Sequence, residues 1–193
     1  MTTSDHLDAM AGELASADHD VRTRALAALI GAGQAAVPAL EVALGSSGPA
    51  ARGAAAQALA EIGDPAAEGT YRSMLDDADP TVRARGAQGL HIIGAAGAAK
   101  ALADVIDELP DLLRHPVTIP VRALAARGAE GGRAAAPLLA ATSNSTRERA
   151  LLVLRMLAGG PDAPAGLAEV LAGHDGSRPD PDLAHRVLGL LRG

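Results

Sequence analysis

Apolar and polar positions along this chain follow helical spacing, and one short phrase of positions recurs. In each copy an arginine is followed by a leucine seven residues later and by a glycine eleven residues later. The three regular copies are Val21–Gly33, Ala51–Gly63 and Val82–Gly94. Their arginines are 30 and 31 residues apart, and self-similarity at such a period is typical of stacked supersecondary units. The pattern therefore predicts a repeat architecture.

Each unit is predicted to contain two helices. The first begins at an Asp-Pro or Ser-Gly-Pro signal, such as Asp79-Pro80, because proline suits the first helical turn. The second carries an inward apolar residue, and these positions are Leu40, Tyr71, Leu102, Leu139 and Leu167. We expect an all-α fold, an α-α superhelix of about five helix pairs. A helix around Leu7–Leu14 caps one end and a half-unit ending at Leu191 closes the other.

The spacing of the inward positions is regular for three units, and the inward position of the fourth unit is about six residues further along the chain than this spacing predicts. We expect the helix that starts near Ala98 to run to Arg114, and Pro116 and Pro120 to break the chain after it. The prediction is a single domain over residues 1–193. It has regular repeats at 20–114, an irregular connector at 115–120 and looser repeats at 121–193.

The repeated phrase resembles the short HEAT-like repeat first described in phycobilin lyases. Asp79–Arg85 matches its opening and Ala60–Ala67 its middle. The resemblance implies a HEAT-like solenoid. Its arginine, matched by Arg22, Arg52, Arg83 and Arg147, implies a structural ladder. In such a ladder the guanidinium bonds helix-end carbonyls or an aspartate of a neighbouring turn, such as Asp20 or Asp79. Adaptors, lyase subunits, regulatory scaffolds and some DNA glycosylases share this repeat, so it indicates the fold rather than the partner.

The resemblance also implies where partners bind, because the second helix of each pair lines the concave face in that family. Val42 and Ser73 fall on this inner face by register. The predicted partner-binding residues are Glu41, Arg72, Asp76, Asp104, Asp107, Glu108 and Asp111. The last four are spaced i, i+3, i+4 and i+7, so they would share one helix face. That acidic stripe is open to three interpretations: a solvated face, a docking surface for a basic partner, or a cation site.

Composition narrows the function classes. The chain has no cysteine, which excludes disulfides, thiolate metal sites and cysteine nucleophiles. Residues 1–111 carry a charge of −9 and residues 112–193 carry +3, a polarity suited to orienting a charged partner. We find no signal-peptide pattern and no uninterrupted membrane span, so we expect a cytoplasmic protein. The strong preference for arginine over lysine suggests a GC-rich, bacterial genome.

Catalytic motifs do not emerge from the sequence. No two of the six histidines are four residues apart, and neither a Gly-x-Ser-x-Gly nor a Walker phrase is present. A pI near 5.4 and the lack of Phe and Trp disfavour nucleic acid as a partner. We expect a non-enzymatic adaptor that binds a protein or peptide, a basic one being among the options, and that uses no cofactor or metal. The alternative is a lyase-like or accessory enzyme subunit that binds a small molecule in the groove.

Overall fold

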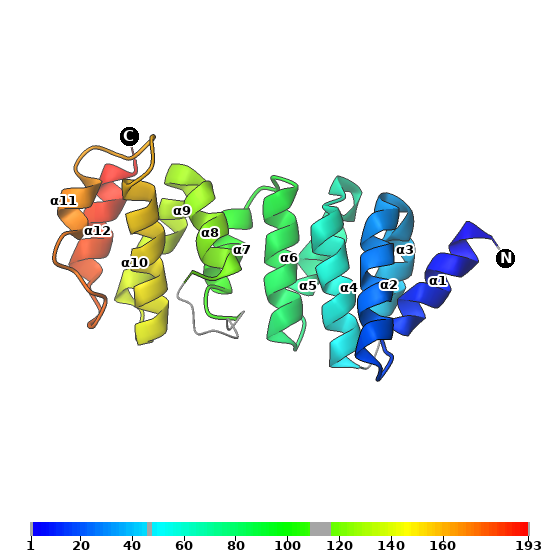
Figure 1. The fold of residues 1–193 in the computed structure, drawn as a ribbon. Helices are drawn as coiled ribbons and strands as arrows, with labels where there is room; N and C mark the ends of the chain where they lie inside the picture. Colours follow the sequence, from blue (N-terminus) through cyan, green and yellow to red (C-terminus); the bar gives the residue numbers. More distant parts are fainter. Residues whose placement is uncertain (1, 46–47, 109–116, 193) are drawn as a thin grey trace. The chain divides into compact units, whose positions relative to one another are not determined.

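The computed structural model describes residues 2–45, 48–108 and 117–192, and every regular element in these ranges is a helix (Figure 1). The all-α prediction is thus confirmed. The chain divides into two compact units, Met1–Ala96 and Gly97–Gly193, which we call unit 1 and unit 2.

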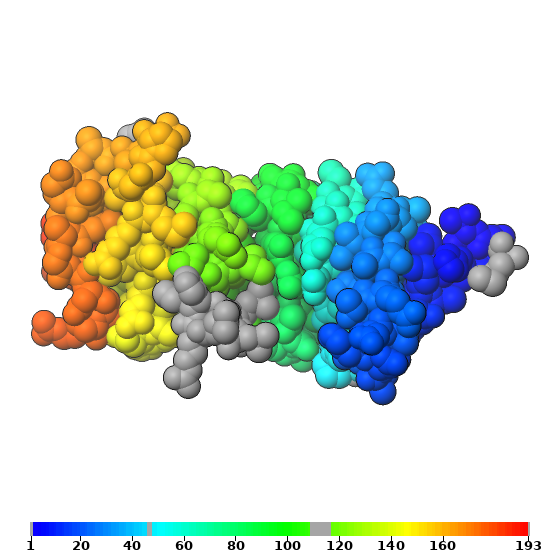
Figure 2. Space-filling view, viewed as in Figure 1, coloured from blue at the N-terminus to red at the C-terminus, as the bar shows by residue number. Residues whose placement is uncertain are grey.

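Unit 1 is built of helix pairs that follow a capping helix. Its α-helices are α1 (Thr3–Glu13), α2 (His19–Ala32), α3 (Val37–Leu44), α4 (Pro49–Ile62), α5 (Glu68–Met74) and α6 (Pro80–Ile92). Two short 3₁₀ helices, η1 (Gly33–Ala36) and η2 (Pro65–Ala67), join the members of the first two pairs. The helix α4 packs against α2, α3 and α6, and the space-filling view shows these segments closely packed (Figure 2).

Local sequence signals set the helix boundaries as predicted. Asp79 is the N-cap of α6, where its carboxylate accepts a hydrogen bond from the Thr81 N–H at 2.8 Å, and Pro80 occupies the first helical position. Such a cap satisfies an amide that the helix itself leaves without an acceptor. At the C-terminal end of α4, Gly63 has a left-handed φ of 62° and ends the helix. Glycine adopts this conformation without strain.

The only aromatic side chain lies at the centre of unit 1. Tyr71 is fully buried on α5, which confirms its predicted inward position. Its hydroxyl donates a hydrogen bond to the Leu59 carbonyl at 2.7 Å. A Cβ atom at Gly89 would overlap the Tyr71 ring, so the glycine makes room on α6 for the ring. This is how a chain poor in aromatics accommodates one large side chain in a close-packed core.

Unit 2 contains the remaining helices. They are α7 (Ala98–Asp104), α8 (Ile119–Ala126), α9 (Gly128–Ala135), the 3₁₀ helix η3 (Ala136–Ala140), α10 (Asn144–Ala158), α11 (Leu167–Leu171) and α12 (Pro181–Leu190). The α10 helix packs against α8, α9, η3 and α11, and α12 packs against η3. Leu139, Leu151, Leu154, Leu167 and Leu183 form the middle of an aliphatic core.

The helix predicted from Ala98 to Arg114 is wrong in its length. The α7 helix ends at Asp104, and residues 105–108 form turns. Val105 and Ile106 are buried in these turns, 4% and 2% exposed, so the chain leaves the helix while its apolar residues still contact the core. In the sequence, Pro110 opposes the predicted continuation to Arg114, since proline has no N–H for a helical bond and disfavours helix in the residue before it. Residues 109–116 lie outside the described part of the chain.

One segment has the length and composition of a membrane span, which the sequence analysis did not expect. Among the described residues this is His19–Leu44, 26 residues with a mean hydropathy of 1.5, and a third of its most apolar window is buried inside the structure. The segment comprises α2, η1 and α3, and Gly33 with a φ of 59° interrupts it. Core helices of soluble proteins meet the same criterion.

Candidate functional site

The arginines of the repeated phrase form the predicted structural ladder. The Nη1 atoms of Arg22, Arg83 and Arg147 each donate to two carbonyls, five and six residues earlier, at 2.7 to 3.0 Å. Arg52 contacts the carboxylate of Asp77, with its Nε 3.3 Å from Oδ2. The aspartate that pairs with Arg52 is Asp77, whereas the Asp79 carboxylate caps α6 and Asp20 lies in the first turn of α2, which Asp18 caps. These arginines hold the turns before α2, α6 and α10, and a role in recognition is not needed to explain them.

The predicted partner-binding residues of unit 1 lie on its surface. Glu41 on α3 accepts a hydrogen bond from the Thr70 hydroxyl of α5. Arg72 donates to the Glu68 carboxylate at 2.7 Å and to the Ala96 carbonyl at 3.1 Å. Asp76 is exposed just after α5. Glu41 and Arg72 thus lie exposed on two successive second helices, and their place on a concave face stays a prediction.

Beside Glu41 lies an apolar groove that the sequence analysis missed. Val42 is 79% exposed, the highest value among the large apolar side chains of the described residues. It borders a groove of about 330 Å³ between α1, α3 and the start of α4. The groove is lined by Asp8, Ala11, Gly12, Ala15, Ala39, Val42, Ala43 and Ala51. The alanine pattern of α1 and α3 is the signal in the sequence, but only packing shows that it leaves a groove.

The acidic residues of unit 2 do not form the predicted stripe. Asp104 is exposed and pairs with Lys100 at 2.6 Å. Asp107 lies beyond the end of α7, where it accepts hydrogen bonds from Ser145 and Thr146 and pairs with Arg149 of α10. Glu108 is half-buried in the same turn, and Asp111 lies outside the described residues. Because α7 ends at Asp104, one helix face does not hold these carboxylates.

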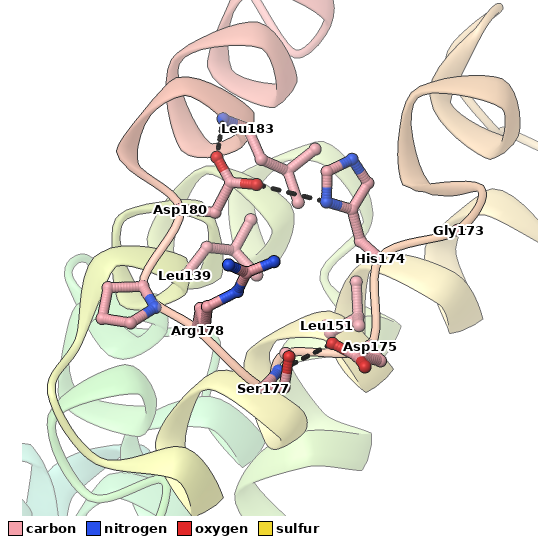
Figure 3. Close-up of a pocket in the computed structure, with 11 residues that line it drawn as sticks. Leu139, Leu151, Gly173, His174, Asp175, Ser177, Arg178, Asp180 and Leu183 are labelled. Carbon is pink, nitrogen blue, oxygen red and sulfur yellow. Dashed lines mark hydrogen bonds and ion pairs between the residues drawn. The ribbon is translucent and has the colours of Figure 1, made fainter.

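A polar pocket in unit 2 was also missed, since the sequence analysis treated residues 174–181 only as a loop. Its volume is about 510 Å³ (Figure 3). Its lining consists of Leu139, Leu151, Gly173, His174, Asp175, Gly176, Ser177, Arg178, Pro179, Asp180 and Leu183. The sequence does contain a signal for this pocket. His174, two aspartates and Arg178 lie within seven residues, next to prolines that prevent helix formation.

Hydrogen bonds hold the carboxylates of this pocket. Asp180 caps α12, accepting the Leu183 N–H at 2.7 Å, and its other oxygen is 3.2 Å from His174 Nδ1. Asp175 accepts the Ser177 N–H at 2.9 Å. Hydrogen bonds from the Ser177 side chain and backbone lower the pKa of Asp175 below its usual 3.8. The shift keeps this carboxylate charged, which is the opposite of what a general acid at neutral pH needs.

Within residues 2–45, 48–108 and 117–192, no three His, Asp or Glu side chains gather in a way that would hold a metal ion.

The stacked helix pairs and the arginine ladder define an α-helical repeat solenoid. The HEAT-repeat family matches residues 7–68 and, in a second match, 54–119, so more than half of the chain is covered and the chain belongs to the HEAT repeats. The more specific phycobilin-lyase type stays a prediction. No curated protein matches the chain.

Two solved structures are similar to the chain over 96% of its length. One is the crystal structure of an engineered protein from the Northeast Structural Genomics Consortium, 20% identical, with a TM-score of 0.48 and 96% of that chain covered. The other is a designed armadillo repeat protein, 19% identical, with a TM-score of 0.45 and 99% of that chain covered. No function is transferred from either. A repeat solenoid of this kind is an architecture typical of protein-interaction scaffolds.

Proposed function

We propose that this protein is a non-enzymatic scaffold that binds a partner protein or peptide on the exposed face of its second helices. The binding region is centred on the groove beside Val42. One observation carries the proposal: a valine that is 79% exposed stands at the edge of an apolar groove lined by small residues. Burying a valine side chain contributes about 1.5–3 kcal/mol, so a partner that covers this position gains affinity there.

The charges around the groove define the chemistry of the partner. Asp8 lines the groove and Glu41 precedes Val42, and both are exposed. Unit 1 as a whole has twelve acidic and six basic residues, a net charge of −6. A partner helix with an aliphatic side chain for the groove and lysine or arginine on its flanks complements both features.

The test compares the proteins that the wild type, Val42→Asp and Met156→Asp capture from a cell lysate. Val42→Asp places a charge at the groove edge, and Met156→Asp is the matched control, because Met156 is an exposed apolar residue of unit 2. We expect a protein that the wild type and Met156→Asp retain and Val42→Asp loses. The captured protein, once purified, should bind Val42→Asp at least about tenfold more weakly than it binds the wild type, as measured by calorimetry.

Thermal unfolding of all three forms serves as the control for folding. Equal affinity of the wild type and Val42→Asp for every retained protein would remove the Val42 groove from the proposal. A captured partner whose contact segment is acidic would contradict the proposed charge complementarity.

A further inference from the structure

The polar pocket of unit 2 supports an inference that is independent of the proposed function, because its lining residues all belong to unit 2 and those of the Val42 groove all belong to unit 1. The pocket is built on a rigid base. Arg147 is only 4% exposed and uses all five of its N–H groups, the full donor capacity of a guanidinium. Its acceptors are the carbonyls of Ala141, Thr142, Gly176 and Ser177 and the side-chain oxygen of Asn144, at 2.7–2.9 Å.

These bonds orient the backbone of the loop. The carbonyls of Gly176 and Ser177 point to Arg147. In a trans peptide group the following N–H points the opposite way, so the N–H groups of Ser177 and Arg178 are directed away from the buried guanidinium. The Ser177 N–H is taken by Asp175 at 2.9 Å. The Arg178 N–H has no acceptor among the described residues.

The side chain of Arg178 has no hydrogen-bond partner in the described part of the chain, and its charge is close enough to Asp175 to help lower the pKa of that carboxylate. The Arg178 side chain is exposed and makes no hydrogen bond or ion pair with the described residues, and in Figure 3 it extends over the pocket. The two carboxylates that line the pocket are already engaged, Asp175 by Ser177 and Asp180 by Leu183 and His174. The pocket therefore offers donors from Arg178 that have no acceptor among the described residues, beside two carboxylates that already accept hydrogen bonds.

We propose that this pocket binds the C-terminal carboxylate of a peptide that ends in an aliphatic residue. The carboxylate is held by the guanidinium and N–H of Arg178, a fork that matches two carboxylate oxygens. The aliphatic side chain packs over the small exposed parts of Leu139, Leu151 and Leu183, core residues that also line the pocket. A volume of about 510 Å³ is in the range of small-ligand pockets. A monovalent carboxylate is favoured over phosphate because Asp175 and Asp180 repel a doubly charged anion more strongly.

The test uses N-acetyl-leucine as the probe and the ¹⁵N-labelled full chain as the receptor, observed by NMR. We expect the amide signals of residues 174–180 to shift in a saturable way. N-acetyl-leucinamide lacks the charge, acetate lacks the aliphatic group, and inorganic phosphate supplies a different anion. Each of these should bind at least about tenfold more weakly.

Two variants locate the site. Arg178→Gln should weaken binding of N-acetyl-leucine about tenfold. Arg186→Gln, which removes an exposed arginine of α12 that does not line the pocket, should leave the affinity unchanged. The proposal is overturned if the 174–180 signals do not shift, if Arg178→Gln binds as the wild type does, or if the amide, acetate or phosphate binds as well as the acid.

Discussion

At the scale of single residues, two buried polar side chains organise the structure. Tyr71 inserts the only aromatic ring into the space left by Gly89 and bonds the Leu59 carbonyl. Arg147 holds two loops with one guanidinium. In both cases a polar group is removed from water and its hydrogen bonds are replaced inside the protein, which is the condition under which burial is tolerated.

Tyr71 should make stability depend on alkaline pH. Burial raises the pKa of the Tyr71 phenol above its ordinary value of 10.0, so the folded protein holds this proton more tightly than the unfolded chain does. The contribution of Tyr71 to the free energy of unfolding is complete below that ordinary pKa. It is lost as the pH rises through the raised pKa that Tyr71 has in the folded protein. We expect denaturant unfolding between about pH 8 and about pH 11 to show this loss.

Tyr71→Phe is the matching control for that titration. It should abolish the Tyr71 part of the alkaline loss, and it should cost about 1 kcal/mol at neutral pH because one buried hydrogen bond is missing. The cost is limited since the Leu59 carbonyl also accepts the Gly63 N–H at 3.0 Å. The ultraviolet absorbance of tyrosinate reports on this residue alone, because the chain has one tyrosine. An ordinary pKa in that titration would contradict the prediction.

Arg147→Lys should destabilise unit 2 by about 2–4 kcal/mol, because lysine keeps the charge but cannot reproduce five bonds in a planar fork. Hydrogen exchange should show the loop opening, above all at the Asp180 N–H that bonds the Leu139 carbonyl at 2.9 Å. Arg22→Lys is the comparison, since Arg22 is half-buried with two carbonyl acceptors. That change should cost about 1 kcal/mol, and equal costs for both substitutions would refute the difference in role.

At the scale of helices, the contacts of Asp107 explain how the end of α7 is joined to the start of α10. Its carboxylate accepts hydrogen bonds from Ser145 and Thr146 in the first turn of α10 and pairs with Arg149 one turn later. A negative charge near a helix N-terminus is favourable, because the first amides of the helix have a partial positive charge. Asp107 is therefore a structural residue, whereas Asp104 forms only an exposed pair with Lys100.

Asp107→Ala and Asp104→Ala should separate these roles. We expect the first to lower the free energy of unfolding by about 2 kcal/mol, because it leaves Arg149 and two hydroxyls without their acceptor. The second should change it by less than about 0.5 kcal/mol, as is usual for an exposed ion pair. Denaturant unfolding measures both, and a similar loss for the two variants would mean that Asp107 does not join these elements.

At the scale of the whole molecule, charge is distributed unevenly between the two units. Unit 1 has twelve acidic and six basic residues, while unit 2 has eleven of each. An excess of one sign attracts an oppositely charged partner over a distance that salt shortens to about 8 Å at physiological ionic strength. Under the proposed function, the basic partner is attracted to unit 1.

Ionic strength should therefore weaken partner binding in a way that depends on the groove charges. We expect affinity to fall several-fold between about 0.05 M and about 0.5 M salt. The double variant Asp8→Asn, Glu41→Gln should show weaker binding at low salt and a smaller salt dependence. Asp162→Asn, Glu169→Gln removes two exposed acids of unit 2 and is the matched control. An affinity that is independent of salt would contradict the charge argument.

The sequence alone determined the repeat period, the all-helical fold, the Asp-Pro helix starts and the ladder role of Arg22, Arg83 and Arg147. These features depend on a residue and its near neighbours: a cap bonds an amide two residues away, and a ladder arginine bonds carbonyls five and six residues away. Local spacing therefore carries the information. The exposure of Glu41 and Arg72 agrees with the register of the second helices, whereas their place on a concave face stays a prediction.

Only the tertiary structure decided where α7 ends, which groups meet Asp107, and where the groove and the pocket lie. The partners of Asp107 are 38 to 42 residues away, and the pocket brings Leu139 and Leu151 to the loop at 173–180. These contacts between residues far apart in the sequence depend on how the helices pack, so the periodicity of the sequence does not reveal them. The predicted acidic stripe was wrong for that reason: it assumed a continuous helix where packing of Val105 and Ile106 and bonding of Asp107 favour a turn.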